Sequence, residues 1–182
     1  MATRRIAVEL KGISPLLMHA FPNVAIEAVE KKTPEEQAEF SAYRVPTENG
    51  TRGELYVPGI NVQRGLVAAA TFSKGKGRAS LQKSAAACLM LAPERLLLGT
   101  TQYEVDARPV VIPATKGRVM RYRPRLDHWK IAFTLEYDDT LLSEKQVRQI
   151  VDDMGSRVGI LDFRPERKGP FGRGMVTNWE HL

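Results

Sequence analysis

GSRVGILDFRPERKGPFGRGMV, residues 155–176, is the stretch of this chain that says most about its architecture. Its last glycines, Gly169, Gly172 and Gly174, follow a basic segment and run directly into an apolar strand pattern. Glycine has no Cβ atom, so its backbone can adopt positive φ and another chain can approach it closely. The surrounding cations suit phosphate: Arg164, Arg167, Lys168 and Arg173. A basic loop that exposes its backbone beside a strand predicts a polyanion site. A tight hairpin with solvated charges is the alternative interpretation.

Strands and helices follow one another in a definite order on the N-terminal side of this loop. Alternating apolar residues predict strands, and Thr33-Pro34 and Ser143 are typical helix starts. Residues 85–91 and 96–105 fit either strands or buried helices, and we favour strands. The expected elements are a strand at 6–10, a helix at 33–43, a strand at 54–57, a helix at 61–72 capped by Asn61, the two ambiguous strands, a hairpin of 108–112 with 118–122, a strand at 129–137, a helix at 144–154 ending at Gly155, and a strand at 174–179.

This order predicts an α+β domain with a ferredoxin-like, RRM-like βαββαβ core and an antiparallel sheet. We expect one domain over residues 1–182, interrupted by insertions at about 20–53 and 106–126. Both core helices would cover one face of the sheet, which leaves the other face free to bind or to stack.

Charge favours a polyanionic partner. The 182-residue chain is 43% apolar, enough for a core, and its net charge is +6. Residues 64–83 and 108–125 carry only basic charges, whereas acidic residues dominate 136–153. Such segregation suggests a basic face and an acidic face, and copies of the chain could then associate head to tail.

The composition also argues against several classes of protein and of binding site. The single cysteine, Cys88, rules out an internal disulfide and a cysteine metal cluster. No apolar run approaches the ~20 residues of a membrane span, and the N-terminus lacks the apolar region of a signal peptide. We therefore expect a cytoplasmic protein with no membrane partner, no cofactor and no metal.

Two segments carry the other candidate binding residues. In YVPGINVQRG, residues 56–65, the free N–H groups of a helix start could attract phosphate, although Pro-Gly before a helix is also an ordinary turn. In RVMRYRPRLDHW, residues 118–129, alternate arginines share one strand face as a ladder suited to phosphate, or serve as a solvated edge. With the mobile-looking loop SKGKGRAS at 73–80, the candidates are Gly59, Asn61, Gln63, Arg64, Lys74, Lys76, Arg78, Arg118, Arg121, Arg123 and Arg125.

His19 is the one weak candidate for catalysis. A histidine in a turn near a basic site could act as general acid or base in RNA cleavage, but a lone histidine is more often structural. Asp106, Asp127 and Asp162 have no evident partners, and aspartate in a loop is usually a turn residue. No HExxH, cysteine–histidine or Walker-type spacing is present, so metal-hydrolase and P-loop interpretations lose support.

Four segments in order resemble the RAMP (repeat-associated mysterious protein) superfamily of CRISPR systems: GISPLLMH, YVPGINVQRGLVAAA, RVMRYRPRL and VGILDFRPERKGPFGRGMV. The chain is most similar to backbone subunits that polymerise along guide RNA, in a short form such as phages and prophages carry. The resemblance implies an RRM-like fold and binding of single-stranded or guide-like RNA, with other effector subunits as partners. It implies phosphate contacts at Gly59, Asn61, Gln63 and Arg64, and a glycine-rich contact at Gly169, Phe171, Gly172 and Arg173.

The function expected from the sequence is non-catalytic, sequence-independent binding of single-stranded nucleic acid, RNA rather than DNA, with assembly along the strand. Three alternatives stay open. They are a metal-independent endoribonuclease that uses His19, a phage protein that binds or anneals single-stranded DNA, and a scaffold or inhibitor whose basic face binds an acidic protein.

Overall fold

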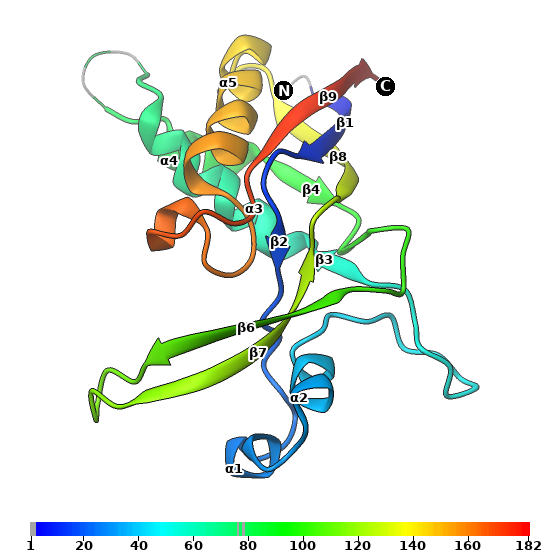
Figure 1. Ribbon diagram of the computed structural model, residues 1–182. Helices are drawn as coiled ribbons and strands as arrows, with labels where there is room; N and C mark the ends of the chain where they lie inside the picture. The colour runs from blue at the N-terminus through cyan, green and yellow to red at the C-terminus, as the bar shows by residue number, and fades with distance from the viewer. Residues whose placement is uncertain (1–2, 76, 78) are drawn as a thin grey trace.

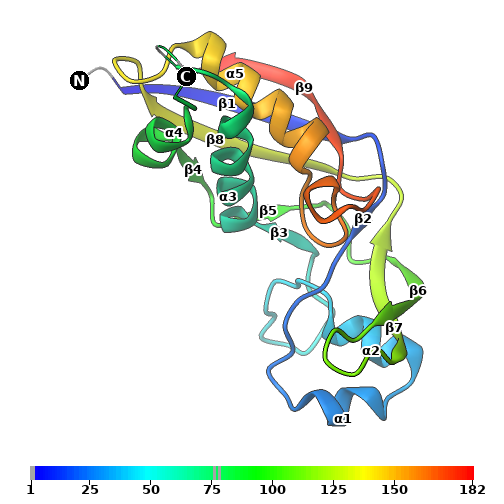
Figure 2. The same cartoon turned by 90° about the vertical axis from the view of Figure 1, so that its left-hand side faces the viewer.

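The computed structural model describes residues 3–182 except 76 and 78, and they form two lobes (Figures 1 and 2). The core lobe holds a four-stranded sheet with its helices. The insertion lobe, built from residues 18–55 and 98–128, lies below it in both views. The elements are β1 (Thr3–Gly12), β2 (Leu16–Leu17), α1 (Ile26–Glu30), α2 (Pro34–Phe40), β3 (Tyr56–Pro58), α3 (Gly59–Ala69), a 3-10 turn (Ala70–Phe72), α4 (Gln82–Cys88), β4 (Met90–Ala92), β5 (Arg95–Leu97), β6 (Glu104–Val111), β7 (Arg118–Leu126), β8 (Lys130–Asp138), α5 (Glu144–Asp153), a π-helical turn (Met154–Val158), a 3-10 turn (Pro165–Arg167) and β9 (Gly174–His181).

The core sheet confirms the ferredoxin-like prediction. Its antiparallel order is β4-β8-β1-β9, and α3 lies between β1 and β4 in the chain while α5 lies between β8 and β9. The period-2 pattern fixes the register, because Val8 lies opposite Phe133 and Leu10 opposite Ile131, with all four side chains buried. Burial of each such side chain contributes about 1.5–3 kcal/mol.

The helices α3 and α5 cover one face of this sheet (Figure 1). Leu66 of α3 and Ile150 of α5 are fully buried against it. Ser143 begins α5 with the predicted cap, since its hydroxyl accepts from the Gln146 N–H and the Gln146 side chain accepts from the Ser143 N–H. The opposite face carries small side chains such as Ala7 and Ala132.

The insertion lobe joins two segments that are distant in sequence. β6 and β7 form a long antiparallel hairpin, α2 packs on it, and the two-residue strand β2 pairs with the end of β7. Arg44 ties the segments together, because its guanidinium contacts Glu39 and donates to the carbonyl oxygens of Gly53 and Thr101 at 2.9 Å each. Thr33 begins α2 with the predicted capping box, and the helix ends at Phe40 rather than Tyr43.

Several predicted elements and boundaries differ from the structure. Residues 85–91 are mostly helix α4, because the alanine-rich run favours helix, and the strand is only Met90–Ala92. Residues 96–105 divide between β5, which pairs with β3, and the start of β6.

Two further errors concern the ends of the core helices. Asn61 does not cap α3, which begins at Gly59 behind Pro58. Gly155 does not end α5, since the chain continues through a π-helical turn to Gly159, which has φ +73°. Gly155 is instead a packing position, because a Cβ atom there would overlap the Gly174 carbonyl group.

Among the described residues, no helix is both long and apolar enough to cross a membrane.

Candidate nucleic-acid interface

A polar cavity of about 310 Å³ lies at the seam between the two lobes. We call it the seam cavity, and its lining comes from both lobes and from the C-terminal loop, residues 159–173: His19, Phe21, Tyr43, Asn61, Leu161, Asp162 and Arg164. A second hollow of about 120 Å³ shares His19 and Phe21 and opens between α1, α2 and β7. Phe21 therefore stands on the wall between two concavities, with 81% of its surface exposed.

Asp162 is the electrostatic centre of the seam cavity. Its Oδ2 atom contacts the guanidinium of Arg123 and lies 3.4 Å from His19 Nδ1. Burial by itself raises the pKa of this carboxyl group, but the hydrogen bond from His19 and the charge of Arg123 outweigh burial and lower the pKa from 3.8 to about 2. Asp162 is thus an ionised acceptor at any physiological pH.

This ion pair predicts an acid-labile contribution to folding. The folded pKa of Asp162 lies below its ordinary value, so the stabilisation is complete above about pH 4 and is lost as pH falls from about 4 to about 2. The contribution is at most about 2 kcal/mol. Urea unfolding of Asp162→Asn should show lower stability at pH 7 and a shallower loss between pH 4 and 2 than the wild type. The control is Asp127→Asn, at a more exposed carboxylate beside Arg125. An equally steep acid loss in Asp162→Asn contradicts the assignment.

The side chain of Asn61 holds the C-terminal loop against α3, and Arg164 braces the loop from within. Asn61 Oδ1 accepts the Leu161 N–H at 2.9 Å, and Arg164 donates to the Leu161 carbonyl oxygen at 2.8 Å. The side chain of Asn61 was predicted to cap the helix, but in the structure it positions the C-terminal loop.

The glycines of the C-terminal loop are packed inside it, so the prediction of an exposed glycine backbone is wrong. Gly172 has φ +72° and is buried, and a Cβ atom on it would overlap the Ile160 carbonyl oxygen. A Cβ atom on Gly169 would overlap the carbonyl group of Phe163. The glycines permit the loop to fold onto itself, and what it exposes are the side chains of Arg167, Lys168 and Arg173.

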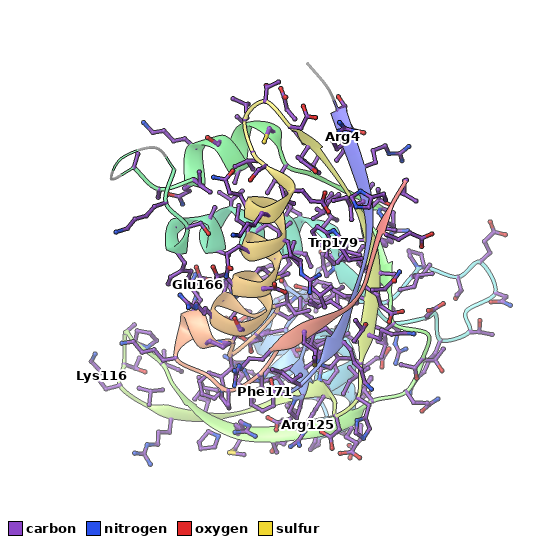
Figure 3. All side chains as sticks on the ribbon, turned by 90° about the horizontal axis from the view of Figure 1, so that it is seen from above. Arg4, Lys116, Arg125, Glu166, Phe171 and Trp179 are labelled. Atoms are coloured by element: carbon purple, nitrogen blue, oxygen red, sulfur yellow. The ribbon has the colours of Figure 1, made fainter. Side chains whose placement is uncertain are left out.

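Phe171 fastens the C-terminal loop to the hairpin. Its ring is 3% exposed, and the guanidinium carbons of Arg108 and Arg125 lie 4.7 Å and 6.0 Å from its centroid. Figure 3 shows Phe171 and Arg125 together where the loop meets the hairpin, with Lys116 at the hairpin's far end. The buried carboxylate of Asp106 holds Arg108 at 2.7 Å and Arg125 at 4.0 Å, so a cation–π contact and ion pairs act together.

The arginine ladder of β7 forms as predicted but faces the protein. Arg121 lies 3.3 Å from a carboxylate oxygen of Glu30, Arg125 pairs with Asp127 at 2.6 Å, and Arg123 is 7% exposed. The described acids already compensate these three charges, whereas Arg118 is exposed and has no ion pair with the described residues.

The predicted residues near the start of α3 also divide into buried groups that contact the protein itself and exposed cations. Gly59 is buried and donates to the Glu94 carbonyl oxygen at 2.6 Å, while Gln63 Nε2 donates to the Leu89 carbonyl oxygen at 2.7 Å. Arg64 is exposed, three residues after Asn61 and so on the side of α3 nearest the C-terminal loop. Lys74 is also exposed. Lys76 and Arg78 lie outside the described residues.

The structure therefore places fewer of the predicted residues at one site than expected, and it adds residues that were not predicted. Of the predicted cations, those that are exposed and have no ion pair with the described residues are Arg64, Lys74, Arg118, Arg167, Lys168 and Arg173. Phe21 and Tyr43 are site residues that sequence reasoning missed, and Asp162 was taken for a turn residue. The sequence carries one signal for Phe21, an aromatic residue beside the candidate His19 in a segment without strand or helix periodicity.

Comparison with known proteins supports the fold and nothing narrower. No family model matches the chain, and no curated protein matches it. A solved structure similar to it is a chain in the cryo-EM structure of the type III-B Cmr-beta bound to cognate target RNA. The TM-score is 0.52 at 10% sequence identity, and the match covers 99% of this chain but only 61% of the other. The likeness is one of fold, and this chain spans less than two thirds of the length of the other.

Proposed function

We propose that this chain binds single-stranded RNA along its sugar–phosphate backbone, at the seam between its lobes, without cleaving it. The observation that carries the proposal is that the C-terminal loop, which lines an open polar cavity, carries exposed cations that no described acid compensates. Arg167, Lys168 and Arg173 are such cations on this loop, Arg64 is one on α3, and Arg118 is one at the far end of the hairpin. Phosphate contacts of this kind provide affinity without reading sequence.

The solved neighbour supports RNA as the partner. It shares the fold over 99% of this chain, and its own printed description names a bound target RNA. A role within a multisubunit CRISPR-type complex, and head-to-tail association of copies, are parts of the same proposal. Single-stranded DNA is the alternative ligand, because phosphate contacts alone do not distinguish the two sugars.

The proposal is tested by fluorescence anisotropy with a labelled uridine 12-mer at several salt concentrations. We expect binding whose log K falls linearly with log salt, with a slope of about −0.7 for each phosphate contacted. A thymidine 12-mer in parallel decides between RNA and DNA. Absence of binding to both strands at low salt contradicts the proposal.

A second candidate function rests on the pairing of His19 with Asp162. His19 is 46% exposed at the cavity, and its Nδ1 atom faces a carboxylate, the arrangement that orients a histidine as a general base. Such a base would take the proton of a ribose 2′-hydroxyl. The 2′-oxygen would then attack the adjacent phosphorus, and the 5′-oxygen would leave and take a proton from water.

The cleavage candidate predicts shorter products when labelled RNA is incubated with the protein and EDTA. His19→Ala should abolish these products, while Lys145→Ala, in the first turn of α5, should not. Intact RNA with the wild-type protein removes this candidate and leaves the binding proposal untouched.

A further inference from the structure

A hollow of about 580 Å³ lies on the core lobe and shares no lining residue with the seam cavity. We call it the β4 groove, because β4 lines it together with β3 and the first turn of α3. Its apolar lining includes Tyr56, Ile60, Met90 and Leu91. Ile60 and Met90 are 58% and 57% exposed. A hollow of this size with exposed apolar walls is typical of a binding site.

One buried acceptor of the β4 groove has no hydrogen-bond donor among the described residues. Gln63, which lines the groove, donates from Nε2 to the Leu89 carbonyl oxygen at 2.7 Å, and this contact fixes the orientation of its amide. Its Oε1 atom is then buried without a partner. A buried acceptor without a donor destabilises the fold. A ligand that brings an N–H or O–H group into the groove would satisfy it.

The β4 groove lies against a strand with an open edge. In the order β4-β8-β1-β9, β4 is an outer strand, and within the described chain its residues pair with β8 alone. The N–H and carbonyl groups on its outer side can therefore pair with another extended chain, which is how many domains recognise peptides. A three-residue edge offers few such hydrogen bonds, so side chains in the groove must supply the specificity.

Two charges of opposite sign border the β4 groove. Glu94 and Arg95 line it, are exposed, and have no ion pair with the residues that the structure places. The guanidinium carbon of Arg95 lies 5.6 Å from the centroid of the Tyr56 ring, which orients this side chain. An occupant with one basic and one acidic residue complements both charges. A nucleic-acid strand complements only Arg95 and is repelled by Glu94.

We propose that the β4 groove binds an extended peptide segment of a partner protein, which adds to β4 as a further strand. One apolar side chain of the segment lies against Ile60 and Met90. A basic residue of the segment pairs with Glu94, and an acidic one pairs with Arg95. A donor of the segment hydrogen-bonds to Gln63 Oε1. This inference goes beyond the proposed function, because it needs neither RNA nor any residue of the seam cavity.

A random library identifies the peptide without assuming its sequence. Phage that display random 12-residue peptides are selected on the full chain, and phage that also bind Ile60→Asp are discarded in each round. Ile60 is the second residue of α3, where an acidic side chain favours the helix, so this variant should fold. We expect the surviving peptides to share an apolar residue between a basic and an acidic one.

Fluorescence anisotropy with one surviving peptide, synthesised with a label, measures the contacts. We expect binding to be at least about tenfold weaker on Ile60→Asp, and also on Glu94→Arg combined with Arg95→Glu, which exchanges the two charges at constant net charge. The control is Leu141→Asp, at a 50% exposed residue in the turn before α5, which should bind like the wild type. Methylation of the peptide's backbone nitrogens should abolish binding, because a methylated nitrogen cannot donate to β4.

The possible results separate a peptide partner from a second copy and from RNA. The proposal is overturned if no peptide survives, or if binding tolerates backbone methylation or the exchanged charges, or if Leu141→Asp weakens it equally. Sedimentation in which the wild type self-associates and Ile60→Asp does not assigns the groove to a second copy and also overturns it. So does weaker binding of the uridine 12-mer by Ile60→Asp, which makes the groove part of the RNA surface. If the wild type binds the peptide but no RNA, the proposed function fails and the peptide site stands.

Discussion

Arg167→Ala combined with Lys168→Ala is expected to weaken RNA binding by about 25-fold at 0.1 M salt and to reduce the salt slope by about 1.4. Each phosphate contact to a single strand adds about 0.7 to the slope, which is a factor of about 5 in affinity between 1 M and 0.1 M salt. Both side chains are exposed at the 3-10 turn of the C-terminal loop and have no ion pair with the described residues, so their loss should not disturb the fold. Anisotropy titrations from 0.05 to about 0.3 M salt measure both quantities.

The matched control for this pair is Lys83→Ala with Lys145→Ala. These lysines are equally exposed and remove the same charge, but they lie on α4 and in the first turn of α5. We expect a small change in affinity and an unchanged slope. Equal effects of the two double variants would mean that net charge, rather than the C-terminal loop, attracts the strand.

Phe171→Ala is expected to lower the free energy of unfolding by about 3–4 kcal/mol, the usual loss for a buried phenylalanine. The ring is almost completely buried, lies 6.0 Å from the ring of Phe163 and is covered by Arg108, so its removal leaves a cavity and breaks the cation–π contact. Urea unfolding at neutral pH measures the difference.

Two controls isolate the cause of that loss. Phe171→Leu keeps most of the buried volume and should lose less than half as much stability, whereas Phe72→Ala, at a half-exposed ring, should lose less than about 1 kcal/mol. A Phe171→Ala variant as stable as the wild type would show that the loop is held to the hairpin by other contacts.

The central strands of the core lobe could be predicted from the sequence because their pattern is local. The alternation at Ile6, Val8 and Leu10 and again at Ile131 and Phe133 specifies two half-buried strands in any surroundings. Residues 85–91 were predicted as a strand but are mostly helix, because a short apolar run does not distinguish a strand from a buried helix.

The candidate site was less predictable because it depends on partners distant in sequence. Period 2 correctly placed the β7 arginines on one face, but Glu30, Asp106 and Asp162 decide that this face turns inward. None of these acids lies in the same segment as the arginines. The glycines were read as a surface for a ligand, whereas Gly172 is needed for the loop's contact with Ile160.

The insertion lobe is made of two excursions that leave the core at residues 18 and 98 and depend on each other. α2 lies on the hairpin, Glu30 pairs with Arg121, and Arg44 donates to the Thr101 carbonyl oxygen, so polar contacts also join the two excursions. Each excursion covers part of the other, since α2 packs on both β6 and β7. A minimal version of this protein would therefore have to lose both excursions together, since removal of either one would expose the packing surface of the other to water.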